Sequence, residues 1–291
     1  MKRFVLGVLL STTVFGVVAT AHAQNNFIGV STSPGNPTAY FQDFNTPTLS
    51  NVDGSTNPFT SSNDFDNTIV PTIQGFYAVP SVGNLFTSYQ ADGGSQITPA
   101  IYSYGAPSGI NQSDRAFGSI ASSDTQAIFY GFRFRNTGAT AIQSINLAFD
   151  FEFWHRAGGI VGTQTIDFAF STNAFSLTQT GAFTANNSLQ FSVTDNGPLT
   201  TTDLSSPIQT VTKTATLNFS TPVATGNDIW IRWQDVNDGG TNQNHGFAID
   251  NVSVTFQPVP APPAAISLGI GALVGLLSTG ASRLRRRTKR K

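Results

Sequence analysis

The chain has 291 residues, of which only 11% are charged, and it contains 27 Gly, 15 Pro, 24 Phe and no Cys. Globular proteins usually carry about 25% charged residues, so Ser, Thr, Asn and Gly must supply most of the polar surface here. The lack of cysteine excludes disulfides, thiol nucleophiles and Cys-ligated zinc or iron–sulfur sites. This composition is typical of a β-rich protein that works outside the cytoplasm.

The charges are segregated along the chain. All 16 Asp and Glu residues lie within 24–257, whereas only six of the 15 Lys and Arg residues do, so this segment carries a net charge of −10. A segment this acidic repels phosphate backbones, which argues against nucleic acid as a partner. The negative charge is compatible with divalent cations or neutral molecules as ligands.

The N-terminus has the layout of a secretory signal peptide. Lys2 and Arg3 precede an apolar stretch, and the segment ends on the small-residue sequence Ala21-His22-Ala23. The apolar stretch is also too short for a comfortable membrane span. We therefore expect residues 1–23 to be removed and the rest of the chain to be exported.

Segment 24–257 is expected to form one β domain. Apolar and polar residues alternate with a period of two, which indicates strands with one buried and one solvated face. From Ile145 to Phe153, for example, every odd-numbered residue is apolar. Strands of this kind usually form antiparallel sheets, and no sustained helical period is present. We predict an all-β fold, an antiparallel two-sheet sandwich of jelly-roll type with a Phe-rich core.

The last strand of this domain changes its alternation halfway. Phe247 and Ile249 are apolar at odd positions, whereas Val252 and the next apolar residues fall at even positions. A strand cannot change faces without an extra residue. We therefore predict a β-bulge at Asp250 and Asn251.

A calcium site is suggested by resemblance. Carbohydrate-binding jelly rolls end in a strand similar to Ile249-Asp250-Asn251-Val252. The resemblance implies that Asp250 helps to hold a structural Ca²⁺ near the first strand, with Asp43 or Asn45 as its partner. Side chains, backbone carbonyls and water could supply the six to eight oxygens that calcium needs. The alternative is an Asp250 that is hydrogen-bonded to backbone at the edge of the core.

Two carboxylates share one predicted strand face. Strand geometry places Asp150 and Glu152 about 6–7 Å apart, between the separations that retaining and inverting glycosidases use. Trp154 follows on the same face and could stack on a sugar ring. We consider a sugar-binding face formed by Asp150, Glu152, Trp154, Trp230 and Arg232, with an ordinary solvated or loop-covered face as the alternative. The Glu-x-Asp-x-x-Glu pattern of laminarinase-like hydrolases is absent.

The histidines give no catalytic signal. His155 and His245 are the only two outside the predicted signal peptide, and they form no close pair. A Gly-x-Ser-x-Gly elbow is also absent. We therefore expect surface or loop histidines, and we assign no catalytic residue.

The C-terminus is also expected to carry a sorting address. It has three parts: a Pro-rich motif over 258–263 with Pro258, Pro260 and Pro262, an uncharged run over 264–282, and a basic tail over 283–291. The run is long enough to cross a bilayer as one helix. Basic residues stay on the cytoplasmic side, which would place the acidic domain outside.

This three-part tail resembles the PEP-CTERM sorting signal of Gram-negative bacteria and cyanobacteria. The resemblance implies that an exosortase cleaves near the motif and that the protein passes to the cell surface or the extracellular polysaccharide. Ala261 stands where that family has Glu. A plain C-terminal anchor is the alternative.

Motifs within the domain, such as Glu152-Phe153-Trp154 and Ile229-Trp230-Ile231, resemble a jelly-roll-like domain of secreted bacterial proteins. That resemblance implies a fold and no particular activity. The first functional hypothesis is accordingly a non-enzymatic cell-surface or matrix protein whose sandwich is an interaction or structural module. The alternatives are a carbohydrate-binding module for exopolysaccharide and a glycoside hydrolase. The expected partners are an exosortase-type enzyme, extracellular polysaccharide and, before processing, the inner membrane.

Overall fold

The structure is a computed structural model. It describes residues 27–45, 56–58, 60–61, 68–69, 73–82, 86–106, 114–159, 162–238 and 244–261. The predicted signal peptide, the predicted transmembrane helix, the basic tail and Pro262 lie outside these residues. Within them, the only helix is the single 3₁₀ turn η1 (Asn187–Leu189). No helix in the described part of the chain is long and apolar enough to cross a membrane.

The described residues form two β-sheets. Sheet 1 contains nine strands: β1 (Ile28–Val30), β4 (Thr60–Ser61), β5 (Thr68–Ile69), β6 (Phe76–Pro80), β10 (Ala127–Asn136), β12 (Gln164–Ser171), β13 (Thr184–Ala185), β14 (Phe191–Val193) and β16 (Asp228–Val236). Sheet 2 contains eight: β2 (Thr38–Gln42), β3 (Thr56–Pro58), β7 (Ser88–Asp92), β8 (Ala100–Gly105), β9 (Arg115–Ile120), β11 (Ile142–His155), β15 (Gln209–Val223) and β17 (Gly246–Pro258).

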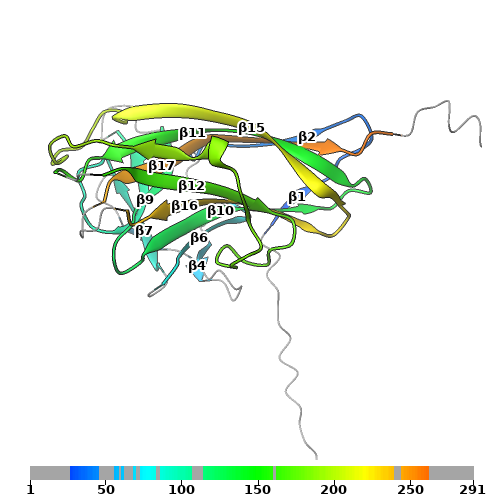
Figure 1. The fold of residues 1–291 in the computed structure, drawn as a ribbon, viewed down its shortest axis with the longest axis horizontal. Helices are drawn as coiled ribbons and strands as arrows, with labels where there is room; N and C mark the ends of the chain where they lie inside the picture. Colours follow the sequence, from blue (N-terminus) through cyan, green and yellow to red (C-terminus); the bar gives the residue numbers. More distant parts are fainter. Residues whose placement is uncertain are drawn as a thin grey trace, which may run out of the picture.

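The two sheets face each other as a sandwich (Figure 1). Sheet 1 has the order β13-β12-β16-β10-β6-β5-β4, and sheet 2 the order β15-β11-β17-β9-β8-β7-β3. β1 adds to β10, β14 adds to β12, and β2 adds to β17. From β9 to β12, and again from β15 to β17, successive strands alternate between the sheets.

Both sheets are mixed, which corrects the prediction of purely antiparallel sheets. β1 runs parallel to β10, and β7 runs parallel to β8. The remaining pairs among the described strands are antiparallel, for example β11 with β15 and β17. Side chains alternate with the same period in both kinds of sheet. Alternation therefore reveals a strand and its faces without revealing its direction.

Phenylalanine fills the space between the sheets, as the sequence predicts. Phe134 of β10 meets Phe256 of β17 with ring centroids 5.0 Å apart, and Phe149 of β11 meets Trp233 of β16 at 5.1 Å. Each fully buried side chain of this size contributes about 1.5–3 kcal/mol. The predicted inner face of β11 is confirmed, because its members are all buried in this core: Ile145, Leu147, Phe149, Phe151 and Phe153.

The predicted bulge in β17 is also present. Ala148 pairs with Ser253 and Asp150 pairs with Asp250, so a single residue of β11 lies opposite two residues of β17. Asn251 adopts a left-handed conformation with φ 50°, which Asn tolerates better than most residues. The extra residue lets Ile249 and the apolar residues after the bulge all point into the core.

Candidate binding surface

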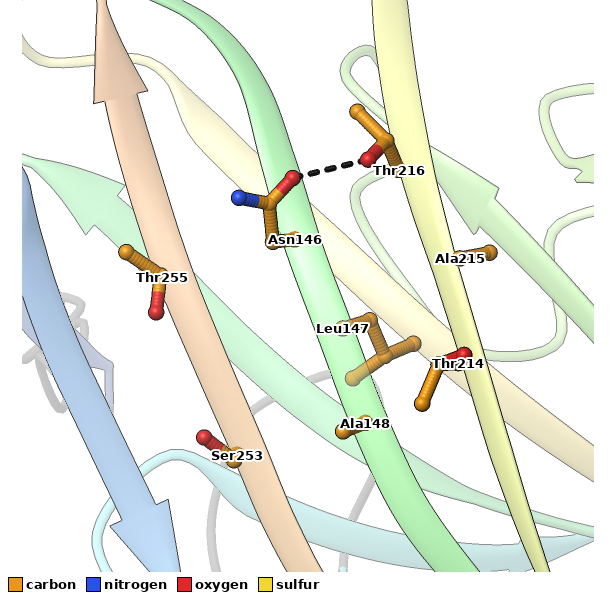
Figure 2. Close-up of a pocket in the computed structure, with 8 residues that line it drawn as sticks. All are labelled: Asn146, Leu147, Ala148, Thr214, Ala215, Thr216, Ser253 and Thr255. Atoms are coloured by element: carbon orange, nitrogen blue, oxygen red, sulfur yellow. Dashed lines mark hydrogen bonds between the residues drawn. The ribbon is translucent and has the colours of Figure 1, made fainter.

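A shallow groove of about 360 Å³ lies on the outer face of sheet 2 (Figure 2). It crosses the neighbouring strands β15, β11 and β17. Its lining residues are Asn146, Leu147, Ala148, Thr214, Ala215, Thr216, Ser253 and Thr255. Hydroxyl, amide and methyl groups thus dominate the lining.

Strand register aligns these side chains in rows across the sheet. Ala148 pairs with Thr214 on one side and with Ser253 on the other. Asn146 pairs with Thr216 in the next row, and the hydroxyl of Thr216 donates a hydrogen bond of 2.8 Å to Oδ1 of Asn146 (Figure 2). Paired residues point to the same face, because the strands share one pleat.

Strand β2 extends the rows by one strand and adds an aromatic ring. Phe41 pairs with Ser253, so the two side chains share the outer face. The neighbouring Tyr40 points inward, where it contacts Phe132 at 5.5 Å between ring centroids. Phe41 therefore points outward, and it is 59% exposed. We call the outward side chains of these rows the platform: Phe41, Asn146, Ala148, Thr214, Thr216, Ser253 and Thr255.

The platform is uncharged, and acidic side chains begin at one end of it. Asp150 follows Ala148 on the outer face of β11. It accepts hydrogen bonds from the hydroxyl of Thr212 at 2.5 Å and from Nδ2 of Asn251 at 2.9 Å. These bonds hold the carboxylate against the sheet, so Asp150 marks the limit of the neutral surface.

Glu152 and Trp154, further along the same face, are buried. Trp154 is only 4% exposed, and its ring stacks on Tyr104 at 6.0 Å with 6° between the planes. Its Nε1 donates a 2.7 Å hydrogen bond to Glu152. The pKa of Glu152 is raised to about 7, chiefly by burial and to a smaller extent by the charges of Asp114 and Asp150, against the lowering effect of the Trp154 bond. Neither side chain is open to a ligand.

Asp250 lies beside Asp150 and Glu152, and we call these three carboxyl residues the acidic group. Asp250 is 2% exposed, and burial raises its pKa to about 8, with the charge of Glu152 adding to the effect. Its Oδ1 has no hydrogen-bond partner among the described residues. An unpartnered buried carboxylate oxygen is the chemical feature that a cation ligand would show.

The other two predicted calcium ligands are already engaged. Oδ1 of Asp43 accepts the backbone N–H of Asn45 at 3.1 Å, and Oδ1 of Asn45 accepts the backbone N–H of Arg115 at 2.6 Å. In the described part of the chain, no group of three or more His, Asp or Glu side chains is arranged to hold a metal ion. Calcium at Asp250 would need amide, carbonyl or water oxygens as well, and it stays a prediction.

Trp230 and Arg232 lie on the opposite side of the molecule. Both belong to β16 of sheet 1 and point to its outer face, under the loop that follows β12. The guanidinium of Arg232 lies 4.6 Å from the ring of Phe129 and 3.9 Å from that of Phe183, and its Nη1 donates to the carbonyl of Leu177 at 2.6 Å.

The five residues of the predicted sugar face therefore do not meet. Asp150, Glu152 and Trp154 are on sheet 2, whereas Trp230 and Arg232 are on sheet 1. Trp230 is 1% exposed, and burial lowers the pKa of Arg232 to about 10. The physical reason is that alternation along each strand cannot tell which sheet the strand joins.

The expectation of surface or loop histidines is only partly met, because His245 lies in the loop just before β17 and His155 ends β11, but both side chains are buried. His155 and His245 are at most 1% exposed. Nδ1 of His245 accepts the backbone N–H of Ala157 at 3.1 Å, and its own backbone N–H donates to Gln164 at 2.6 Å. Burial lowers the pKa of His245 to about 4. Burial also lowers the pKa of His155, so at neutral pH both rings are uncharged and buried parts of the fold.

Sequence reasoning missed the platform. In the sequence, Thr212, Thr214 and Thr216 alternate with other residues and so indicate a solvated face, but no local pattern indicates that Asn146 and Ser253 lie beside them. Phe41 was also missed, because the sequence around it alternates poorly. The signal that could have found Phe41 is its position beside Tyr40, since two adjacent aromatics in a strand point to opposite faces.

No protein-family model matches the chain, and no curated protein matches it. Solved structures give weak likenesses. The K2 cleaved adhesin domain of Lys-gingipain is 12% identical with a TM-score of 0.32, over 76% of this chain and 99% of that one. A cyclase from Fischerella sp. TAU is 13% identical with a TM-score of 0.37, over 77% and 100%. A xylan-binding module is 10% identical with a TM-score of 0.33, over 71% and 99%. At these values the likenesses support no conclusion about function.

Proposed function

We propose that this protein is an exported, non-enzymatic β-sandwich module that binds a neutral polysaccharide of the cell surface or extracellular matrix. The platform carries this proposal. It is a row of uncharged hydroxyl, amide and methyl groups with a 59% exposed phenylalanine, Phe41, at its margin.

The chemistry of the platform suits a sugar polymer. Hydroxyl side chains such as Thr214 and Ser253 both donate and accept hydrogen bonds, as sugar hydroxyls do. The Phe41 ring offers an apolar surface for the C–H face of a sugar ring. An anionic polymer would be repelled by the net charge of −10 in segment 24–257. A neutral polysaccharide is therefore the favoured ligand.

The burial of Glu152 and the hydrogen bonds of Asp150 argue against a hydrolase that uses these two carboxyl groups. A general acid must reach the leaving oxygen of its substrate. Glu152 is only 8% exposed and accepts a hydrogen bond from Trp154. Asp150 is held by two side chains of the sheet. The pair is better explained as part of the acidic group at the end of the platform.

A Phe41→Ala variant tests the proposal. The probes are immobilised cellulose, xylan, mixed-linkage β-glucan and starch. We expect the wild type to be retained by at least one of them and the variant to bind that polysaccharide at least tenfold more weakly, because a stacked sugar ring loses its apolar partner.

Phe175→Ala is the matched control, since Phe175 is 61% exposed and lies near the outer face of sheet 1. This variant should bind like the wild type. Equal affinities of the wild type and the Phe41→Ala variant would show that the platform is not the binding surface.

We also propose that the chain is sorted through its C-terminal sorting signal, residues 258–291. Pro258 is the last residue of β17, and the backbone N–H of Val259 still bonds to the carbonyl of Ala141 at 2.9 Å. Pro260 is exposed. Cleavage on the C-terminal side of Pro260 would therefore leave the hydrogen bonds of β17 intact.

The mass of the mature protein, measured by native mass spectrometry after isolation from its own cell, tests this address. We expect a chain that begins at Gln24, lacks the basic tail and is found outside the inner membrane. The same spectrum would reveal one bound Ca²⁺ if Asp250 holds the predicted ion. A mature chain that retains residues 283–291 would refute processing.

A further inference from the structure

A second cavity, which we call the hollow, lies beside the groove of the platform. It encloses about 540 Å³ between the turn after β12 and the C-terminal part of β15. β15 is the edge strand of sheet 2, and β12 is near the edge of sheet 1, so the hollow opens at the side of the sandwich. Phe170 and Phe219 give it an apolar wall, with ring centroids 6.1 Å apart. Ser171, Thr184 and Ser220 are among its polar lining.

A local irregularity of β15 creates this hollow. Asn218 pairs with Ser144 and Val223 pairs with Ile142, so four residues of β15 lie opposite Gln143 alone. A strand with extra residues bends away from its neighbour. Three of those extra residues line the hollow: Phe219, Ser220 and Thr221.

The platform and the hollow are continuous along β15. Thr214 and Thr216 line the platform, and Asn218 and Ser220, two and four residues further on, line the hollow. All four side chains are exposed. At about 3.3 Å per residue, the stretch from Thr214 to Ser220 is about 20 Å long. That stretch is several times as long as a single sugar ring.

The hollow has the same chemical character as the platform. None of its lining residues is charged, although segment 24–257 as a whole is strongly acidic. Hydroxyl and amide groups beside an aromatic wall are what binding pockets for neutral, hydroxyl-rich ligands present.

We propose that the hollow is a second sugar subsite and that one polysaccharide chain runs from the platform along β15 into it. The inference rests on the proposed function. It specifies the ligand as an internal stretch of a long, neutral polysaccharide rather than its end or a short oligosaccharide. Two subsites on one polymer bind together more tightly than either does alone, because the second contact becomes intramolecular. A short oligosaccharide would occupy the platform alone, because Phe41 supplies the stacking surface there.

The test is a length series. Oligosaccharides of increasing length are prepared from whichever neutral polysaccharide retains the wild type, and their affinities are measured by calorimetry. We expect the affinity to rise at least tenfold between a disaccharide and a chain that spans about 20 Å, and then to level off. In a Thr221→Trp variant, whose indole fills the hollow, this rise should disappear while disaccharide binding stays unchanged.

Thr201→Trp is the matched control, because Thr201 is also exposed and lines neither the groove of the platform nor the hollow. It should keep the full rise, and melting curves should show that both variants are folded. A Thr221→Trp variant with the wild-type length dependence would overturn the second subsite while leaving the platform in place. If no neutral polysaccharide retains the wild type, or if Phe41→Ala has no effect, the proposed function fails and the inference fails with it.

Discussion

A Trp233→Ala variant is expected to lose about 3–5 kcal/mol of its free energy of unfolding. Trp233 is fully buried between the sheets. Its ring contacts Phe149 of sheet 2 at 5.1 Å and Phe168 of sheet 1 at 5.7 Å between centroids, both edge to face. Alanine would leave a large cavity in a core that cannot fully collapse. Because domains are stable by only about 5–15 kcal/mol, much of the stability would be lost.

Chemical denaturation followed by far-UV circular dichroism measures this effect. Trp233→Phe is the graded comparison. The indole N–H of Trp233 has no hydrogen-bond partner among the described residues, so phenylalanine removes a buried donor as well as some volume, and we expect a much smaller loss. Phe175→Ala removes an exposed ring and should change stability by less than about 0.5 kcal/mol. A Trp233→Ala variant as stable as Phe175→Ala would contradict the described core.

An Asp235→Asn variant is expected to be more stable than the wild type at alkaline pH. Asp235 is 1% exposed and accepts a 2.6 Å hydrogen bond from the hydroxyl of Ser119. The pKa of Asp235 is raised to about 8, chiefly by burial and to a smaller extent by the charge of Asp238, against the lowering effect of the Ser119 hydrogen bond. The folded protein therefore holds a proton on this carboxyl at pH values where the unfolded chain has released it.

The sign of the pH dependence follows from linkage. A raised folded-state pKa contributes stability that is complete below the unfolded value of about 3.8 and is lost as the pH rises through about 8. Asp250, with a pKa of about 8, and Glu152, at about 7, act in the same direction. His245, lowered to about 4, acts in the opposite direction below its unfolded value of 6.5. We expect the wild type to be most stable at mildly acidic pH.

Asparagine at position 235 keeps the shape and the acceptor oxygen but cannot ionise. The gain at pH 9 is expected to be several kcal/mol and no more than about 6 kcal/mol, because a folded pKa of about 8 against an unfolded value of about 3.8 corresponds to about 1.4 kcal/mol for each pH unit between them. Denaturation curves between pH 4 and pH 9 provide the measurement, with Asp124→Asn as the control because Asp124 is exposed. If Asp235→Asn and the wild type lose stability in parallel as the pH rises, Asp235 is not the protonated group.

Local patterns predicted the faces of the long strands well. The alternation from Ile145 to Phe153 identified a whole inner face, and the shift in alternation around Asp250 and Asn251 located the bulge to within one residue, since Asp250 itself pairs with Asp150. Both signals are local, because successive side chains of a strand point to opposite sides whatever lies next to them. Bulges leave the same kind of signal, since one extra residue reverses the alternation.

The candidate site was predicted much less well. The alternation leaves two interpretations of Trp154 open, a stacking surface for a sugar ring or an ordinary solvated or covered face, because a tryptophan on an outer face is solvated only where no loop or neighbouring ring covers that face. Here Tyr104, from a strand far away in the sequence, stacks on it. Phe41 gave no signal, although it is the most open aromatic on sheet 2 among the described residues.

The order of residues is enough to predict that this chain is a β protein, which side of each long strand enters a phenylalanine-rich core, and where β17 is interrupted. The folded arrangement of the strands was needed to find that Asn146, Thr216 and Ser253 meet on one surface, that Trp230 belongs to the opposite sheet, and that two strand pairs are parallel. The physical reason is that a side chain's face is set by its own backbone, whereas strand neighbours are chosen by hydrogen bonds between backbone groups that are identical at every residue.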